Sequence, residues 1–429
     1  MRSAPTWPPS FARGSSGPFC VKGNGAAGGE NVNFVEFHND ELPRRIQAGN
    51  GRLAAAGTVG LAGIAFEVDG ASYTYLPGPD GVEVVAGDER AACVVAMSAV
   101  SWGEFVEQMR TVPSLLYSGM LSLERGDVEL LLRWEQAIRA LHHGLPVFVP
   151  GELDLRDKDG GRLDIEQVFP ADVGAAELGL FIREAGFAVV RGVFSADEIA
   201  VLRADADSAV AAARQGDRRS WWARSAEGET RLCRVTYANL SCPSIAAICD
   251  DPRVRRLVAA FDDSLLPGPD RLDGIAIIIK NPDIADGLSD LPWHVDCGMG
   301  GHALLCPVVQ VSVLLEPANP DTGTLKFLAG SHRFACSAPA AQEEVGLPVV
   351  TVAGEPGDLL MHLGDTMHAA PAPLGCGSMR RSLVTSFYQP AVLDVIEEGC
   401  GFNDVLLSND DGHVDNLADV VRGTPSGKP

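Results

Sequence analysis

Six short apolar runs follow one another in the second half of the chain: GIAIIIK (274–280), VVQVSVLLE (308–316), GTLKFLAG (323–330), LPVVTVAG (347–354), DLLMHLG (358–364) and SLVTSFYQP (382–390). They are rich in β-branched and aromatic residues, and turn-forming residues lie between them. Many short strands separated by turns are typical of a β-sandwich or a β-barrel. We therefore expect a β-rich architecture for residues 272–390.

The residues just upstream predict helices and a strand that open the same unit. The stretch AELGLFIREAGFAVVRGVFSADEIAVLRADADSAVAAAR (176–214) begins with a helical pattern, followed by the strand-like run FAVVRGV (187–193). A second helix begins at Ser195, and Glu198 stands three residues later, which is the spacing of a capping box. We assign residues 176–395 to this unit.

A smaller α+β unit is predicted for residues 31–145. Asp69-Gly70 joins two alternating runs, which is a hairpin signal. Apolar residues recur at helical spacing in GDVELLLRWEQAIRALHHG (126–144), and Gly144 stands where a helix commonly ends. The remaining segments are a flexible tail (1–30), a connector (146–175) and an acidic C-terminal tail (396–429).

Composition restricts the partners of the chain. It has 429 residues, with 34 Lys and Arg against 57 Asp and Glu, a formal net charge of −23. Such a charge repels phosphate backbones, so we expect no nucleic-acid partner. No apolar run reaches the roughly 20 residues of a spanning helix, so we expect no membrane span. The ten cysteines form no C-x-x-C pair and indicate a reduced, cytoplasmic protein. Separately, we expect a homodimer as one form of assembly.

Three residues in the β-rich half form a candidate metal site. His294 and Asp296 in WHVD are two positions apart, so a strand places both side chains on one face. His368, in GDLLMHLGDTMHAAP (357–371), is the expected third ligand, and His362 is its rival. Two imidazoles and one carboxylate leave coordination positions open, as in non-haem Fe(II) oxygenases.

Arg380 stands twelve residues after His368, at the start of the last strand-like run. A guanidinium there can hold a carboxylate bidentately, and Ser382 on the same strand face can add a hydroxyl.

These motifs together resemble the phytanoyl-CoA dioxygenase family of Fe(II)/2-oxoglutarate oxygenases over about residues 176–392. The matching pieces are FIREAGFAVVRGVFSADEIAVLR, the K-N-P upstream of LPWHVD, LLEPANPDTGTLKFLAGSHR, and GDLLMHLGDTMHAAP followed by RRSL. The resemblance implies a double-stranded β-helix, which is a jelly-roll or cupin-like fold, with flanking helices. It implies that iron is held by His294, Asp296 and His368.

The same resemblance implies that 2-oxoglutarate is anchored by Arg380 with Ser382 beside it. Lys280 and Ser312 occupy positions that often face this co-substrate. Ala369-Ala370 and the Gly375–Gly377 turn depart from the family pattern. They leave open whether Arg380 or Arg381 is the anchor, and we choose Arg380 because residue 382 shares its strand face.

The N-terminal unit resembles the sterol-carrier-protein family over about residues 50–145. The matching pieces are DGVEVVAGDERAACVVAMSAVSWGEFVEQM (80–109) and LLYSGMLSLERGDVELLLRW (115–134). That family has a twisted sheet with helices around an apolar tunnel. An α+β dimerisation or scaffold unit without a ligand is the alternative.

The oxygenase resemblance implies hydroxylation, with further oxidation as a later step, driven by O2 and by decarboxylation of 2-oxoglutarate to succinate and CO2. Because Asp296 fills the third ligand position, halogenation is disfavoured. We expect a hydrophobic substrate such as a terpenoid, steroid or polyketide, contacted by Trp221, Trp222 and Trp293. The alternatives are a metal-dependent β-barrel enzyme without 2-oxoglutarate, and a non-catalytic lipid-binding protein with a vestigial iron site.

Overall fold

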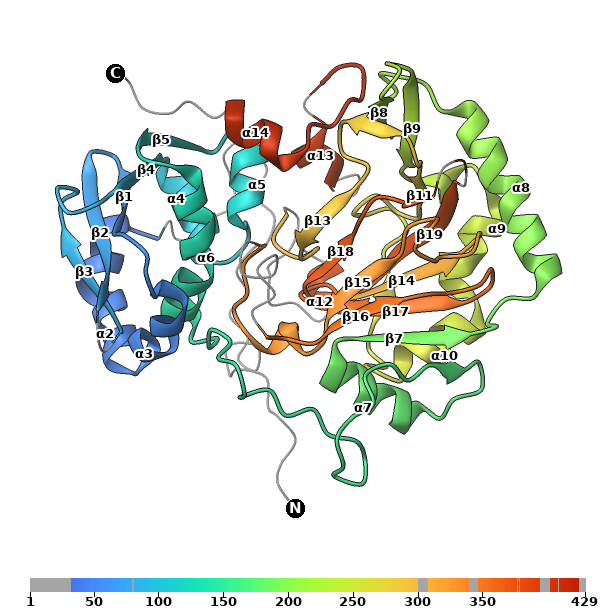
Figure 1. The fold of residues 1–429 in the computed structure, drawn as a ribbon, viewed down its shortest axis with the longest axis horizontal. Coiled ribbons are helices and arrows are strands. Elements are labelled where there is room, and N and C mark those ends of the chain that lie inside the picture. Colours follow the sequence, from blue (N-terminus) through green and yellow to red (C-terminus); the bar gives the residue numbers. More distant parts are fainter. Residues whose placement is uncertain are drawn as a thin grey trace.

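The computed structural model describes residues 32–78, 81–299, 308–338, 346–375, 377, 379–393, 402–407 and 409–423. The tail predicted for residues 1–30 lies outside these residues. Figure 1 shows two sheet-containing regions side by side, an N-terminal one in blue and teal and a larger one in green to red.

The N-terminal region is built on one five-stranded mixed sheet with the order β3-β2-β1-β4-β5. The predicted hairpin is confirmed, because β1 and β2 pair antiparallel with Val68 opposite Ala71. Asp69 and Gly70 both have positive φ, 51° and 80°, as a tight two-residue turn requires. The strands are β1 (Ile64–Val68), β2 (Ala71–Gly78), β3 (Gly81–Ala86), β4 (Cys93–Met97) and β5 (Leu121–Arg125).

Helices pack on this sheet through aromatic side chains. Trp102 and Trp134 are fully buried, and they belong to a core that includes Phe66. The longest helix ends where predicted, with Gly144 in the left-handed conformation (φ 75°). The helical segments are α1 (Phe34–Glu36), η2 (Phe37–Glu41), α2 (Leu42–Gln47), α3 (Asn50–Ala55), η3 (Ala56–Thr58), α4 (Ala99–Val106), α5 (Val112–Tyr117) and α6 (Val128–His143).

The larger region contains two sheets that face each other, which confirms the cupin-like architecture predicted for it. The large sheet has the order β12-β8-β9-β11-β19-β14-β17-β7-β6, with β10 beside β19, and the small sheet has the order β13-β18-β15-β16. Phe187 of the large sheet stacks on Phe327 of the small one at 4.7 Å between ring centroids.

The strands of the large sheet are β6 (Phe169–Pro170), β7 (Phe187–Arg191), β8 (Ser220–Ser225), β9 (Thr230–Val235), β10 (Leu266–Pro267), β11 (Ala276–Lys280), β12 (Ile284–Asp286), β14 (Val309–Leu314), β17 (Leu359–Leu363) and β19 (Arg380–Tyr388). Those of the small sheet are β13 (Leu291–His294), β15 (Leu325–Leu328), β16 (Val349–Val352) and β18 (His368–Ala370).

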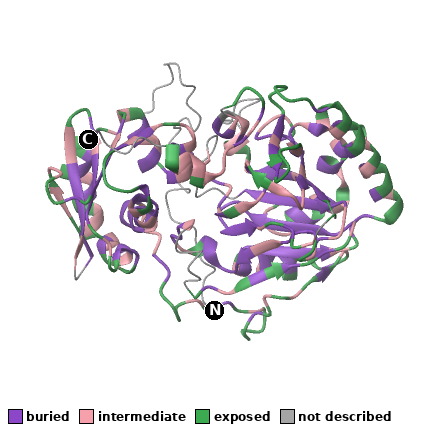
Figure 2. Ribbon diagram, turned by 45° about the horizontal axis from the view of Figure 1, so that its top comes forward, coloured by how far each residue is buried: buried purple, intermediate pink, exposed green. Residues whose placement is uncertain are grey.

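Helices cover the outer side of the large sheet. The capping box predicted at Ser195 is confirmed: its side chain accepts from the Glu198 amide, and the Glu198 carboxylate accepts from the Ser195 amide. Figure 2 shows buried residues gathered in the strands and exposed residues along the outermost helix. The helical segments are α7 (Ala175–Ala185), α8 (Ala196–Ala212), η4 (Ala238–Leu240), α9 (Pro243–Ala246), η5 (Ala247–Asp250), α10 (Pro252–Ala259), η6 (Ser331–Arg333) and α12 (Pro390–Leu393).

The described part of the predicted acidic tail is not a loose end. It contains α13 (Phe402–Leu406) and α14 (Leu417–Gly423), and both contact α5. Val414, between them, is fully buried. The apolar residues of this acidic segment pack it against the rest of the molecule. The acidic character of the segment gave no indication of this packing.

None of the helices in the described ranges combines the length and the apolar character needed to cross a bilayer.

Candidate metal centre and active site

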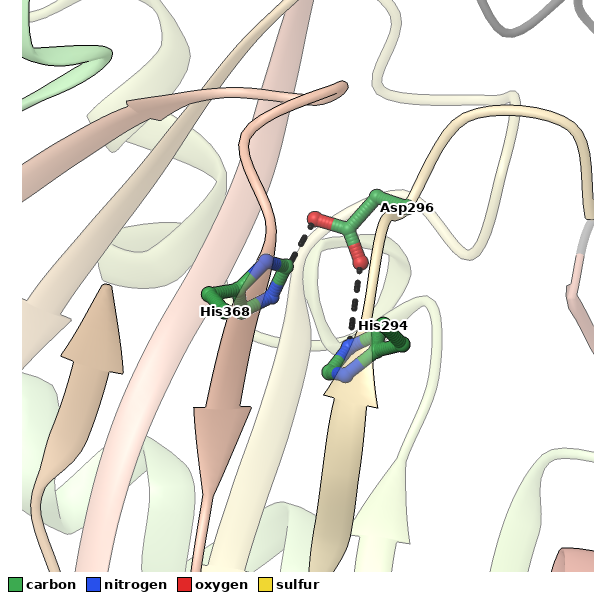
Figure 3. Close-up of side chains that lie close together, drawn as sticks. All are labelled: His294, Asp296 and His368. Carbon is green, nitrogen blue, oxygen red and sulfur yellow. Dashed lines mark ion pairs between the residues drawn. The ribbon is translucent and has the colours of Figure 1, made fainter. Parts of the chain in front are cut away.

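Two strands of the small sheet bring the predicted metal ligands together. His294 ends β13 and His368 begins β18, and the antiparallel register places these residues opposite each other. Asp296 follows two residues after His294. One ligand atom from each of the three side chains lies within 4.8 Å of the others. Figure 3 shows the Asp296 carboxylate turned toward both imidazoles, 3.6 Å from His294 Nε2 and 3.8 Å from His368 Nε2.

Backbone carbonyls orient both rings. His294 Nδ1 donates to the Pro292 carbonyl at 2.7 Å, and His368 Nδ1 donates to the Thr366 carbonyl at 2.9 Å. A carbonyl can only accept, so the proton belongs on Nδ1 in each ring. The Nε2 lone pairs therefore remain available on the side of Asp296, as metal ligation requires.

The protonation states also suit a cation. Burial lowers the pKa of His294 and of His368 to about 4. Burial alone raises the pKa of Asp296, but the neighbouring imidazoles of His368 and His362 outweigh it and hold that pKa well below its usual range. At neutral pH the site thus presents two neutral imidazoles and one carboxylate, which is the form that binds a metal.

His362, the rival third ligand, contacts the site in a different way. It lies on β17, is 4% exposed, and its Nε2 donates to Asp296 Oδ2 at 3.0 Å. Because that nitrogen carries the proton, its lone pair does not face the metal position. The geometry fits a residue that orients the Asp296 carboxylate.

A polar cavity adjoins the triad inside the barrel, and Arg380 lies in its lining. Its side chain is 3% exposed, and within the described part of the chain its Nε has no hydrogen-bond partner. Burial lowers the pKa of Arg380 to about 10, so the guanidinium remains charged at neutral pH. An unpaired buried cation is costly, and a carboxylate placed in this cavity would supply its partner.

Arg381 faces the other way. It forms ion pairs with Glu316 at 2.8 Å and with Asp207 at 2.5 Å. Successive side chains of a strand point to opposite faces. Arg380 and Ser382 both line the cavity and Arg381 does not. The two arginines therefore lie on opposite faces of β19, and residue 382 shares the face of Arg380, as expected from the sequence.

Ser312 and Lys280 also line this cavity, from β14 and β11. The ammonium of Lys280 donates to the carbonyls of Ser289 and Ala370, both at 2.5 Å, and to Asp290 at 3.2 Å. Burial lowers its pKa to about 8. These contacts connect β11 to the small sheet, so a direct contact between Lys280 and a co-substrate stays a prediction.

A second, mainly apolar cavity meets the first one at the metal site, since His294 and Asp296 line both. Trp221 and Trp293 are in its lining. Trp222 lies outside that lining; its Nε1 donates to Ser220 and its ring packs against the barrel core.

Five lining residues of the apolar cavity come from the N-terminal region and were not anticipated from the sequence. They are Thr111, Pro113, Tyr117, Glu135 and Arg139. One signal was present: Glu135 and Arg139 are charged residues four apart on the apolar side of α6, and both are buried.

A family model and several solved structures match part of this chain. The model of the family described as phytanoyl-CoA dioxygenase (PhyH) matches residues 182–382, which include the triad, Arg380 and Ser382. The predicted resemblance is thereby confirmed for this part of the chain. Iron and 2-oxoglutarate are the cofactor and co-substrate that fit the donor set and the unpaired arginine.

Several solved structures are similar to about half of this chain or somewhat more. AviO1 from Streptomyces viridochromogenes Tue57 is 28% identical over 49% of this chain and 92% of its own, with a TM-score of 0.40. The non-heme alpha ketoglutarate dependent epimerase SnoN from nogalamycin biosynthesis is 23% identical over 53% and 92%, with a TM-score of 0.41. EctD from S. alaskensis, crystallised with 2-oxoglutarate and 5-hydroxyectoine, is 18% identical over 60% and 89%, with a TM-score of 0.43. Among curated proteins, none matches the chain.

Proposed function

We propose that this chain is an Fe(II)- and 2-oxoglutarate-dependent oxygenase that hydroxylates a hydrophobic small molecule, such as a terpenoid, steroid or polyketide. One observation carries the proposal. The His294, Asp296 and His368 group lies where two cavities meet, one containing the unpaired Arg380 and the other mainly apolar. A charged co-substrate and an apolar substrate would thus reach one metal from different sides.

Each residue has a defined task in this reaction. The triad holds the metal and leaves positions open for other ligands. Arg380 binds the distal carboxylate of 2-oxoglutarate, and Ser382 and Ser312 line the space beside it. His362 fixes the Asp296 carboxylate by its hydrogen bond. Bound Fe(II) supplies the activation of O2 that is coupled to conversion of 2-oxoglutarate into succinate and CO2.

For the rest of the chain we propose the division made from the sequence, with an oxygenase unit at 176–395 and a sterol-carrier-like unit at 31–145. The five-stranded sheet with its flanking helices supports the second assignment. If this unit carries a lipid, organic extraction of the purified protein followed by mass spectrometry should recover one at near-stoichiometric amounts. Recovery of none would favour the scaffold role.

The oxygenase proposal is tested by anaerobic titration of the protein with Fe(II) and 2-oxoglutarate. A weak visible charge-transfer band should develop to one equivalent. Asp296→Asn should abolish it, because the amide lacks the ligand charge, while Asp321→Asn, in an exposed turn, should keep it. Absence of the band in the wild type, with no succinate formed in air with any candidate substrate, would refute the proposal.

A further inference from the structure

The apolar cavity is closed on one side by a different part of the chain from the one that holds the metal. Thr111, Pro113 and Tyr117 lie on or just before α5, and Glu135 and Arg139 lie on α6. Figure 1 shows α5 and α6 on the side of the N-terminal region that faces the barrel. The cavity is therefore shared between the two regions.

Hydrogen bonds attach this side of the cavity to the loop that follows the metal ligand Asp296. The Thr111 amide donates to the Gly298 carbonyl at 2.7 Å, and its hydroxyl contacts Met299 Sδ at 3.4 Å. Farther along the cavity, Tyr117 donates to the Asp415 carbonyl at 3.2 Å. The N-terminal helices are thus held at a defined position relative to the triad.

Among the residues that the N-terminal region contributes to the cavity lining, Arg139 is the one whose environment points to a ligand. Its side chain lines the cavity and is 7% exposed, yet its Nε has no hydrogen-bond partner among the residues that the structure describes. Nη1 makes one long contact, 3.4 Å to the Cys336 carbonyl. A guanidinium has five donors, so most of its capacity is unused in a largely apolar space. Leaving a buried cation in that state is costly.

The carboxylates of Glu135 and Asp365 lie close enough to raise the pKa of Arg139, but burial outweighs them and lowers it. Glu135, one turn before Arg139, also accepts from the Val112 amide at 2.7 Å. Arg234, at the junction of the cavities, also has an Nε unpartnered by any described residue, but it forms an ion pair with Asp273 at 2.9 Å and its guanidinium lies over the Trp221 ring at 4.5 Å. Arg139 is therefore the better-placed cation for a group that enters with the substrate.

We infer that Arg139 binds an anionic group, a carboxylate or its equivalent, at the end of the substrate remote from the metal. The substrate would be a largely apolar molecule with one acidic end, and the N-terminal helices would set which acids fit. This inference rests on the proposed oxygenase function, and it assigns the N-terminal region a share of the substrate site.

Two dyes with one ring system separate the charge from the apolar body. 1-Anilinonaphthalene-8-sulfonate carries an anionic group, and N-phenyl-1-naphthylamine lacks it. Fluorescence titrations of the full chain should show that Arg139→Gln weakens binding of the sulfonate about tenfold or more, with less than about a twofold change for the neutral dye. Arg133→Gln, on the same helix where Arg133 pairs with Glu129, should change neither.

Two further variants guard against an effect on folding. Arg139→Lys keeps a cation and should retain most of the sulfonate affinity, while Pro113→Trp should obstruct the cavity and weaken both dyes. Equal sulfonate binding by wild type and Arg139→Gln, with Pro113→Trp weakening both dyes, would overturn the inference. So would unchanged binding of both dyes in Pro113→Trp, because the cavity would then take up neither the anionic nor the neutral probe.

The iron and 2-oxoglutarate titration is run on the same variants. The charge-transfer band should survive in Arg139→Gln, because that residue does not line the polar cavity. A wild type without the band would refute the oxygenase function and leave the dye result standing. A wild type with the band and no difference between the dyes would refute only the role of Arg139.

Discussion

At the scale of single residues, strand geometry assigns different tasks to adjacent arginines. Arg380 is buried in the polar cavity with an unpartnered Nε, and Arg381 pairs with Glu316 and Asp207 on the opposite face of β19. The two carry the same charge and differ in what each one faces. This makes them matched controls for each other.

We expect Arg380→Gln to weaken 2-oxoglutarate binding about 100-fold, since it removes a charge-assisted pair worth roughly 3 kcal/mol. Arg381→Gln should change the affinity for 2-oxoglutarate by less than about twofold, because Arg381 does not face the cavity and so makes no charge-assisted contact with the co-substrate. Anaerobic titration of the Fe(II) protein with 2-oxoglutarate measures both. The reverse ranking of the two variants would make Arg381 the anchor.

Side-chain parity along a strand is readable from residue numbers, and on β19 it places Arg380 with Ser382. It does not account for His294 and Asp296, because β13 ends at His294 and Asp296 lies beyond the strand. It was not sufficient to choose between His362 and His368 from the residues alone. That choice depends on which sheet each strand joins: β17 belongs to the large sheet, and β18 pairs with β13 in the small one.

At the scale of elements, the start of α8 depends on a local signal. Ser195 and Glu198 each accept from the other's amide. Ser195→Ala should therefore lower the free energy of unfolding by about 1 kcal/mol. Ser208→Ala, an exposed site on the same helix whose hydroxyl bonds only the Ala204 carbonyl, should cause no loss. Urea unfolding followed by circular dichroism compares the two, and equal stabilities would show that the capping box contributes nothing measurable.

Elements with such local signals were predictable, as the Asp69-Gly70 hairpin and the Gly144 helix end show. The helices α13 and α14 were not. They have five and seven residues, and helices this short are stable only through tertiary contacts. Their contacts are with α5, which is about 300 positions away along the chain, as the Tyr117–Asp415 separation of 298 illustrates.

At the scale of the whole molecule, the sequence predicted two units without their relative position. The shared cavity depends on that position, because Arg139 and the metal ligands are brought together only by contacts such as Thr111 with Gly298. An amphipathic pattern predicts that a helix buries one side, but it does not predict which surface that side packs against. The two charged residues on the apolar side of α6, Glu135 and Arg139, were the local sign that this helix packs against a surface that is not purely apolar.

The net charge of −23 affects how the chain binds anionic ligands. An acidic chain must admit an anionic co-substrate, and the proposed substrate also carries an anion. Arg380 and Arg139 lie in different cavities on either side of the metal site, and both are buried. Buried charges are screened less by salt than exposed ones, so each can act on its ligand against the field of the surface.

The last prediction concerns the stability of the whole chain toward acid. Two buried imidazoles and a half-buried one lie together in the N-terminal region: His38 Nε2 is 2.9 Å from the Tyr75 hydroxyl, which is 3.3 Å from His142 Nε2, and the half-buried His143 follows next in the chain. Burial lowers the pKa of His38 to about 4 and that of His143 to about 3, and it lowers the pKa of His142 as well.

Between pH 6.5 and 4 the unfolded chain takes up a proton at His38 that the folded chain does not. Stability must therefore fall as pH falls through this range, by up to about 1.4 kcal/mol per pH unit for each such histidine. Urea titrations of the metal-free protein at pH 7, 6 and 5 measure the slope, and His38→Gln should make it shallower while lowering stability at pH 7. An identical slope in wild type and variant would mean that His38 is protonated in the folded protein, against the burial that lowers its pKa.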